Sequence, residues 1–306
     1  MKKRLLTGAV ILLLTALAVA SRLVTIYFFD FFVMAISFVA TYEMIRANLV
    51  EEAKLNLTVK NTAYVYIPLI YCYLVYMCYA VAKSVTEAML FQLLVFAVLI
   101  LASVITELVY LKKCRDAEFD LPTDQLFRST KISAKIMLYP VTLIASLYGF
   151  GLNGMGTMFG LMIVVLIFLV SMGTDVFAYC IGMSFHKGIF ASQISPKKSI
   201  SGAIGGILGG IINSALVCII CYFLLKDNPF EAFGLAKTIT FFALSGVLGS
   251  CFVEAGDLFA SAIKRRVGIK DFGKMFPGHG GMMDRIDGLC FASFVIFVLT
   301  AVIFLV

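Results

Sequence analysis

Residues 256–288 read GDLFASAIKRRVGIKDFGKMFPGHGGMMDRIDG, a strongly charged stretch between two apolar runs. Carboxylates, cations and glycines are mixed through it, and so dense a charged cluster is not needed to span a bilayer. Magnesium binds carboxylate oxygens together with substrate phosphates, and Lys and Arg neutralise the remaining phosphate oxygens. This stretch, the signature segment below, therefore indicates a phosphorylated substrate held through a divalent metal.

The rest of the chain has the composition of a membrane protein. Of its 306 residues, 61% are hydrophobic and 14% are charged, whereas soluble domains have about half apolar and a quarter charged residues. A spanning helix needs about 20 apolar residues, and no alternating barrel pattern competes. We predict an all-α, polytopic integral membrane protein with about nine transmembrane helices, near residues 5–20, 23–46, 62–82, 88–111, 132–150, 155–182, 201–225, 235–264 and 287–306.

Three parts of the chain follow from these runs. Residues 1–111 are N-terminal transmembrane helices, 112–154 a cytoplasmic loop with a middle transmembrane helix, and 155–306 the C-terminal catalytic helices. The first run follows three basic residues and ends in small ones, so it could also be a signal peptide. We expect a retained first helix because the second run begins almost immediately.

The distribution of Lys and Arg predicts the orientation in the cell membrane. With the N-terminus inside, four of the 25 basic residues face outward and 21 face inward. The outward four are Arg22, Lys83, Lys226 and Lys237. The signature segment is then cytoplasmic. The net charge of +7 is explained by basic loops beside anionic lipids, so no nucleic-acid partner is expected.

Several carboxylates fall inside the apolar runs. Asp30 is a candidate functional group because intramembrane carboxylates are costly, although it could instead lie near the outer interface. Glu43 and Glu107 lie near cytoplasmic helix ends, and we expect them to meet the interface, although they could instead border the site. Among the eight cysteines, Cys218 and Cys221 have CxxC spacing, but they lie within an apolar run and no second pair accompanies them, so we expect neither a metal site nor a disulfide framework.

Residues 171–206 are the second informative region. Asp175 and Tyr179 share one helical face. Lys197 and Lys198 precede a helix start, where free backbone N–H groups favour an anion; the alternative is a helix cap with inward-facing lysines. The following glycines are spaced for close helix packing, and they are Gly202, Gly205, Gly206, Gly209 and Gly210.

Polar residues of the last two helices form two stripes. Glu254, Asp257, Ser261 and Lys264 share one face of the helix at 235–264, and Asp284 and Asp287 share a face where the last helix opens. We predict that the carboxylates of Asp257, Asp284 and Asp287 meet at one metal ion, although Asp284 could instead be an N-cap. His279 lies between glycines that let a ligand approach the backbone, and its alternative role is structural.

Three ordered motifs resemble those of the bacterial phosphatidate cytidylyltransferases (CDP-diacylglycerol synthases). The first is the signature run, with specified positions Ser261, Lys264, Arg265, Lys270, Asp271, Pro277, Gly278, His279, Gly280, Gly281, Asp284, Arg285 and Asp287. The others are Asp175-x-x-Ala178-Tyr179-x-x-Gly182 and Ser195-Pro196-Lys197-Lys198-Ser199-x-x-Gly202. Ile200-Ser201 replaces that family's Trp-Glu pair, which leaves any role of the glutamate unfilled.

The resemblance implies cytidylyl transfer from CTP to phosphatidate, giving CDP-diacylglycerol and pyrophosphate for phospholipid biosynthesis, with Mg²⁺ and membrane lipids as partners. It implies catalytic roles for Asp257, Lys264, Lys270, Asp284 and Asp287. It implies substrate binding by Asp175, Tyr179, Ser195, Lys197, Lys198, Ser261, Arg265, His279 and Arg285. The alternatives are a polyprenol kinase, an archaeal-type lipid cytidylyltransferase or a cation-coupled transporter. Whether the protein forms a homodimer is left open by the sequence.

Overall fold

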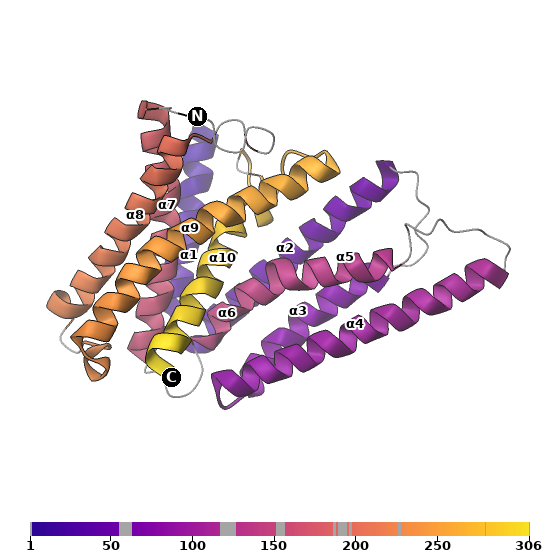
Figure 1. Cartoon of the computed structure of the whole chain (residues 1–306), viewed down its shortest axis with the longest axis horizontal. Helices are drawn as coiled ribbons and strands as arrows, with labels where there is room; N and C mark the ends of the chain where they lie inside the picture. The colour runs from indigo at the N-terminus through magenta and orange to yellow at the C-terminus, as the bar shows by residue number, and fades with distance from the viewer. Residues whose placement is uncertain are drawn as a thin grey trace.

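A computed structural model describes residues 2–54, 63–116, 127–150, 157–185, 188, 195, 198–225, 228–278 and 280–305. Within these ranges the regular elements are all helices, and Phe276 and Gly280 form an isolated antiparallel bridge. The α-helices (Figure 1) are α1 (Lys2–Ser21), α2 (Ile26–Lys54), α3 (Ala63–Val81), α4 (Val85–Asp116), α5 (Arg128–Ile136), α6 (Leu143–Gly149), α7 (Thr157–Phe185), α8 (Ile200–Ile219), α9 (Leu235–Val267) and α10 (Met283–Thr300).

The lengths of these helices suit a bilayer. In the described part of the chain, seven helices are long and apolar enough to cross a membrane. Two shorter apolar helices, Thr7–Ser21 and Val65–Val81, occupy the first and third predicted positions. The protein is an all-α polytopic membrane protein, as the apolar runs predict. The division at 111 and 154 stays a prediction.

The predicted continuous helix at 132–150 is interrupted. A short π-helical segment, Met137–Thr142, separates α5 from α6 and contains Pro140. Proline lacks a backbone N–H and disfavours helical dihedrals in the residue before it. Tyr139 accordingly adopts φ −133° and ψ 115°. The resulting kink turns α5 away from the direction of α6.

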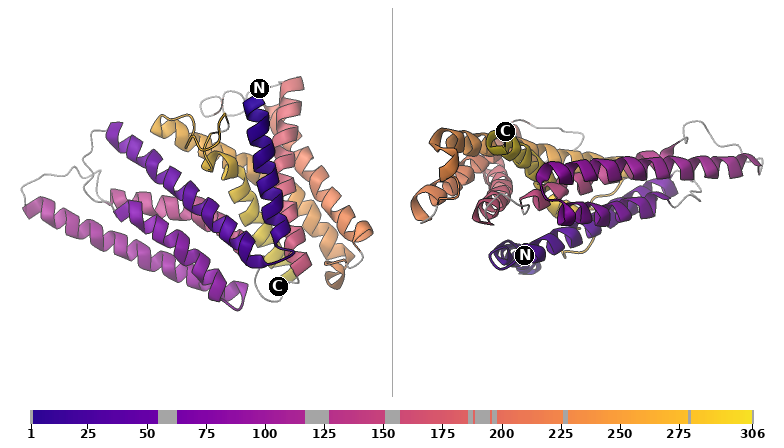
Figure 2. Two further views of the ribbon diagram at one scale, coloured as in Figure 1. Left: turned by 180° about the vertical axis from the view of Figure 1, so that it is seen from behind. Right: turned by 90° about the horizontal axis from the view of Figure 1, so that it is seen from below.

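The helices form two groups that meet at α6 and α10. In Figure 1, α2, α3, α4 and α5 lie on one side, whereas α7, α8 and α9 lie on the other with α1 beside α7. The views in Figure 2 agree with this arrangement and place α1 on one face of the second group. The α7–α8, α8–α9 and α9–α10 pairs are the most extensive packings. The motif-bearing helices are therefore direct neighbours.

The glycine stripe of α8 explains its close packing between α7 and α9. A Cβ atom placed on Gly209 would lie 2.5 Å from the carbonyl oxygen of Gly173, and one on Gly202 would lie 3.0 Å from that of Ala178. The first distance is shorter than a real Cβ contact allows, and the second is tighter than nearly all real Cβ contacts. The predicted packing role of these glycines is confirmed.

Candidate functional site

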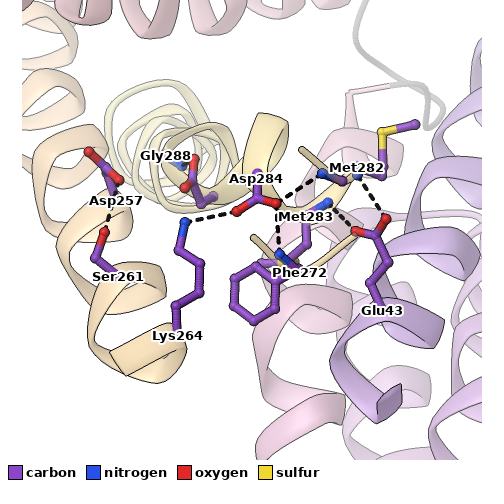
Figure 3. Close-up of polar contacts among 11 residues, drawn as sticks. Glu43, Asp257, Ser261, Lys264, Phe272, Met282, Met283, Asp284 and Gly288 are labelled. Carbon is purple, nitrogen blue, oxygen red and sulfur yellow. Dashed lines mark hydrogen bonds and ion pairs between the residues drawn. The ribbon is translucent and has the colours of Figure 1, made fainter. Parts of the chain in front are cut away.

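The signature segment joins α9 to α10 through a loop that Asp284 closes. Helix α9 ends at Val267, and the next residue, Gly268, adopts the left-handed conformation. Asp284 Oδ1 accepts from Lys264 Nζ at 2.8 Å, and Oδ2 accepts from the backbone N–H groups of Phe272 and Gly281 at 2.8 and 2.9 Å (Figure 3). The N-cap position of α10 belongs to Met282, so the alternative of Asp284 as the N-cap is wrong.

The N-terminus of α10 is instead satisfied from another helix. Glu43 of α2 accepts from the backbone N–H groups of Met282 and Met283 at 3.1 and 2.8 Å (Figure 3). A carboxylate placed there satisfies free N–H groups and complements the helix dipole. A Cβ atom on Gly273 or Gly281 would clash with Oε1 of Glu43, which explains both glycines.

Buried positions correct two expectations about carboxylates. Glu43 is 6% exposed and Glu107 is 4% exposed, so neither meets the interface as expected. Glu107 accepts from the side chain and backbone of Ser129 and from the backbone of Thr130, at the start of α5. Glu43 and Glu107 therefore each accept hydrogen bonds at the N-terminus of another helix. In the sequence, the feature that pointed to them was a carboxylate inside an apolar run.

A second charged cluster centres on Lys198. Its Nζ atom lies 2.5 Å from Glu254 Oε2 and 2.8 Å from Asp257 Oδ2. Burial lowers the pKa of the Lys198 ammonium, but the carboxylates of Asp257 and Glu254 outweigh it and raise that pKa above its ordinary value. The next residue, Ser199, is the N-cap of α8 and accepts from Gly202 N at 3.1 Å. The helix-cap interpretation thus holds for Ser199, whereas Lys198 faces carboxylates.

Two further aspartates approach this cluster. Asp175 on α7 interacts electrostatically with Asp257 and Glu254, and Asp287 on α10 with Asp257 and Asp175. Ser261 donates to Asp257 Oδ1 at a long 3.4 Å (Figure 3). We call these four carboxylates the acidic cluster, namely Asp175, Glu254, Asp257 and Asp287. The sequence had placed Glu254 on the same stripe of α9 as Asp257.

Two cavities meet at Asp175. One, of about 420 Å³, lies between α7, α8 and α9 and is lined by polar residues including Tyr179, Ser195, Lys198 and Asp257. The other, of about 610 Å³, lies between α1, α7 and α10 and is mostly apolar. Asp175 lines both of them. We call them the polar cavity and the apolar groove.

The remaining predicted residues lie elsewhere. Arg285 is exposed and lines the apolar groove. Lys270 is exposed and lines a separate cavity of about 350 Å³ with Arg46 and Lys274. Arg265 is exposed on the last turn of α9. Lys197 and His279 lie outside the described residues.

The acidic cluster has the donor chemistry for a hard cation. Within the described residues, no three His, Cys, Asp or Glu side chains are grouped so that they alone could hold a metal. Magnesium, however, is typically bound by one or two carboxylates together with waters and substrate phosphates. Asp175, Asp257 and Asp287 repel one another, and Lys198 pairs with Asp257 and Glu254, so this cluster favours a further positive charge. The residues therefore fit Mg²⁺ bound jointly with a polyanion.

Tyr139 is a residue that the sequence did not single out. The kink at Pro140 places its ring against Phe259 of α9 and Phe291 of α10, with centroids 4.9 and 5.6 Å away. Its buried hydroxyl has no hydrogen-bond partner among the described residues. It interacts electrostatically with Asp287 and Asp257, so it borders the acidic cluster.

The helical fold and this site define an integral membrane protein that gathers carboxylates and cations where four helices, α7, α8, α9 and α10, pack together. The model of the cytidylyltransferase family matches residues 2–303, so the chain belongs to that family. A phosphatidate cytidylyltransferase of Thermotoga maritima is 42% identical over 119 residues, which are 39% of this chain and 42% of that protein.

Other relatives carry the same name. One of Aquifex aeolicus is 43% identical over 119 residues, 39% of either chain. One of Mycobacterium bovis is 38% identical over 137 residues, 45% of this chain and 39% of that protein. The matched part thus spans about two fifths of these relatives.

Proposed function

We propose that the protein transfers a cytidylyl group from CTP to phosphatidate, giving CDP-diacylglycerol and pyrophosphate. The observation that carries the proposal is the Lys198–Glu254–Asp257 cluster at a polar cavity that shares Asp175 with an apolar groove. Such a site suits a water-soluble polyanion meeting a membrane lipid. The names of the bacterial relatives support this reaction.

The chemistry is a displacement at phosphorus. A phosphate oxygen of phosphatidate attacks the α-phosphorus of CTP, the bond to the oxygen bridging to the β-phosphate breaks, and pyrophosphate leaves with the electron pair. The attacking phosphate is already an anion at neutral pH, so no serine or cysteine nucleophile is required. Positioning and charge neutralisation supply most of the catalysis in such transfers.

Different cationic residues of the chain bind and neutralise different phosphates of the substrates. Lys198 binds a CTP phosphate in the polar cavity, and Tyr179 and Ser195 line the same space. Lys264, which is paired with Asp284, neutralises negative charge on the substrate phosphates. Lys270, Arg265, Lys197 and His279 are proposed as further phosphate or polar contacts, reached when the substrates are bound.

Asp257 and Asp287, with Asp175 beside them, would hold Mg²⁺. Asp284 would add a ligand through a remaining lone pair, because a carboxylate has about four acceptor sites and three donors already occupy Asp284. When bound, Mg²⁺ supplies positive charge to the phosphate oxygens. The excess of Lys and Arg in the loops that carry these motifs supports a site on the cytoplasmic face of the cell membrane.

Purified protein provides the test. We expect pyrophosphate release that requires CTP, phosphatidate and Mg²⁺ together, with CDP-diacylglycerol as the lipid product. A polyprenol kinase would instead release CDP with a polyprenol acceptor. Absence of pyrophosphate release from protein that is folded in detergent or liposomes would contradict the proposal.

A further inference from the structure

Helix α1 is attached to the rest of the protein at both of its ends. At its C-terminal end, Arg22 donates from Nη2 to the carbonyl oxygen of Phe150 at 2.7 Å and lies over the ring of Phe29 at 4.9 Å. At its N-terminal end, Thr7 Oγ1 donates to the carbonyl oxygen of Pro277 in the signature segment at 3.3 Å. These contacts fix α1 along α7 (Figure 2).

Between these attachments the helix borders the apolar groove. Its lining face includes Leu12, Thr15 and Ala16 of α1, opposite Phe168 and Leu169 of α7. Among the described lining residues, Asp175 and Arg285 are the two that carry charge. The groove is therefore amphipathic in composition, with its charge concentrated near the ends of α7 and α10 that also hold the acidic cluster.

We propose that the apolar groove is the acyl-chain site of the lipid substrate, with the lipid phosphate held by Arg285 and the nucleotide bound on the opposite side of Asp175 in the polar cavity. The inference rests on the proposed function and assigns each substrate to its own cavity. It makes α1 a wall of the lipid site.

The dimensions of the groove suit one leaflet. It extends along α7 from Asp175 to Leu161, fourteen residues or about 21 Å at ~1.5 Å per residue. Half of a bilayer hydrocarbon core is about 15 Å thick. An acyl chain can thus lie in the groove at its usual depth in the membrane.

The positive charge of Arg285 at the end of the groove favours a lipid with a phosphate head group. A guanidinium can bind a phosphate through two parallel hydrogen bonds, and Arg285 is exposed in the groove. A monoester phosphate placed at Arg285 would lie beside Asp175, where the two cavities join. The attacking oxygen then faces the cavity that contains Lys198 and Asp257.

A matched pair of α1 variants tests whether this helix lines the acyl-chain site. Leu12 lines the groove and is 54% exposed, whereas Leu17 does not line it and is 58% exposed. Leu12→Trp should lower kcat/KM for a long-chain phosphatidate by about tenfold through overpacking, with the KM for CTP unchanged. Leu17→Trp should match the unsubstituted protein. Equal kinetics of the two variants would overturn the inference.

Photolabelling of the unsubstituted protein is independent of turnover. In liposomes, phosphatidate with a diazirine in its acyl chain should label the groove faces of α1 and α7, and unlabelled phosphatidate should compete. The same diazirine chain on phosphatidylcholine reports background contact with bulk lipid. Identical labelling by both lipids would overturn the inference. Missing pyrophosphate release with competed groove labelling would instead overturn the proposed function and leave the lipid site standing.

Discussion

The ammonium nitrogen of Lys264 lies 2.8 Å from Oδ1 of Asp284 and so joins the last turns of α9 to the first turn of α10. The side chain of Asp284 is buried, with 4% of its surface exposed, and that of Lys264 is partly buried, with 13% exposed. The Lys264 ammonium also lies 5.4 Å from the centre of the Phe272 ring. Through this ion pair and its bonds to the backbone of Phe272 and Gly281, Asp284 links α9, the intervening loop and α10.

Loss of this pair should destabilise the fold. Lys264→Met leaves the Asp284 carboxylate buried without its cation, and breaking a buried pair costs about 3–5 kcal/mol. We expect a clear fall in the Tm of the purified protein, together with loss of activity. Lys274→Met, at an exposed position in the same segment, should leave the Tm unchanged. A Lys264→Met protein as stable as the unsubstituted one would show that the pair is not structural.

The metal assignment depends on charge at Asp257 and Asp284. Asp→Asn at either keeps the size but removes the charge, and we expect about 100-fold lower kcat or more, with a higher Mg²⁺ concentration needed for half-maximal rate. Glu231→Gln, at an exposed position outside the signature segment, is the control. Normal turnover and Mg²⁺ dependence of Asp284→Asn would remove Asp284 from the metal site.

Lys198 should act on the nucleotide. Loss of a charged hydrogen bond costs about 1.5–3 kcal/mol, so Lys198→Ala should lower kcat/KM for CTP by roughly 10- to 150-fold. Lys237→Ala, at an exposed position on the first turn of α9, should have little effect. Initial rates at varied CTP would measure both. Unchanged kinetics in Lys198→Ala would return this lysine to a topological role.

Glu43 should determine the position of α10. Glu43→Gln removes the charge at the helix start and one of two acceptor oxygens for Met282 and Met283, at a cost of about 1–2 kcal/mol. We expect a lower Tm and a lower kcat, because α10 carries Asp284 and Asp287. Glu231→Gln, exposed in the short helix Glu231–Phe233, is the control. Equal thermal unfolding of the two variants would contradict this role.

The orientation can be measured with single cysteines in a cysteine-free background. Lys274 and Lys237 are both exposed lysines, one in the signature segment and one at the start of α9. An impermeant thiol reagent added outside intact cells should label Lys237→Cys and leave Lys274→Cys unlabelled until the cells are lysed. The reverse pattern would invert the topology.

The sequence alone determined the fold class and the local stripes. Apolar runs of bilayer length permit only helices whose backbone groups bond internally, so the all-α membrane fold followed directly. Periodicity placed Asp257, Ser261 and Lys264 on one face of α9 because residues three and four apart are neighbours on a helix. The spacing of the α8 glycines predicted its close packing for the same reason.

Only the tertiary structure decided which charges meet. Glu43 reaches Met282 and Met283 across about 240 positions, and Lys198 reaches Glu254 across 56. Helix periodicity relates residues within one helix and carries no information about which face packs on which neighbour. The break at Pro140, the pairing of Lys264 with Asp284 and the separation of the polar cavity from the apolar groove depend on helix packing, which the free energy of the whole fold determines.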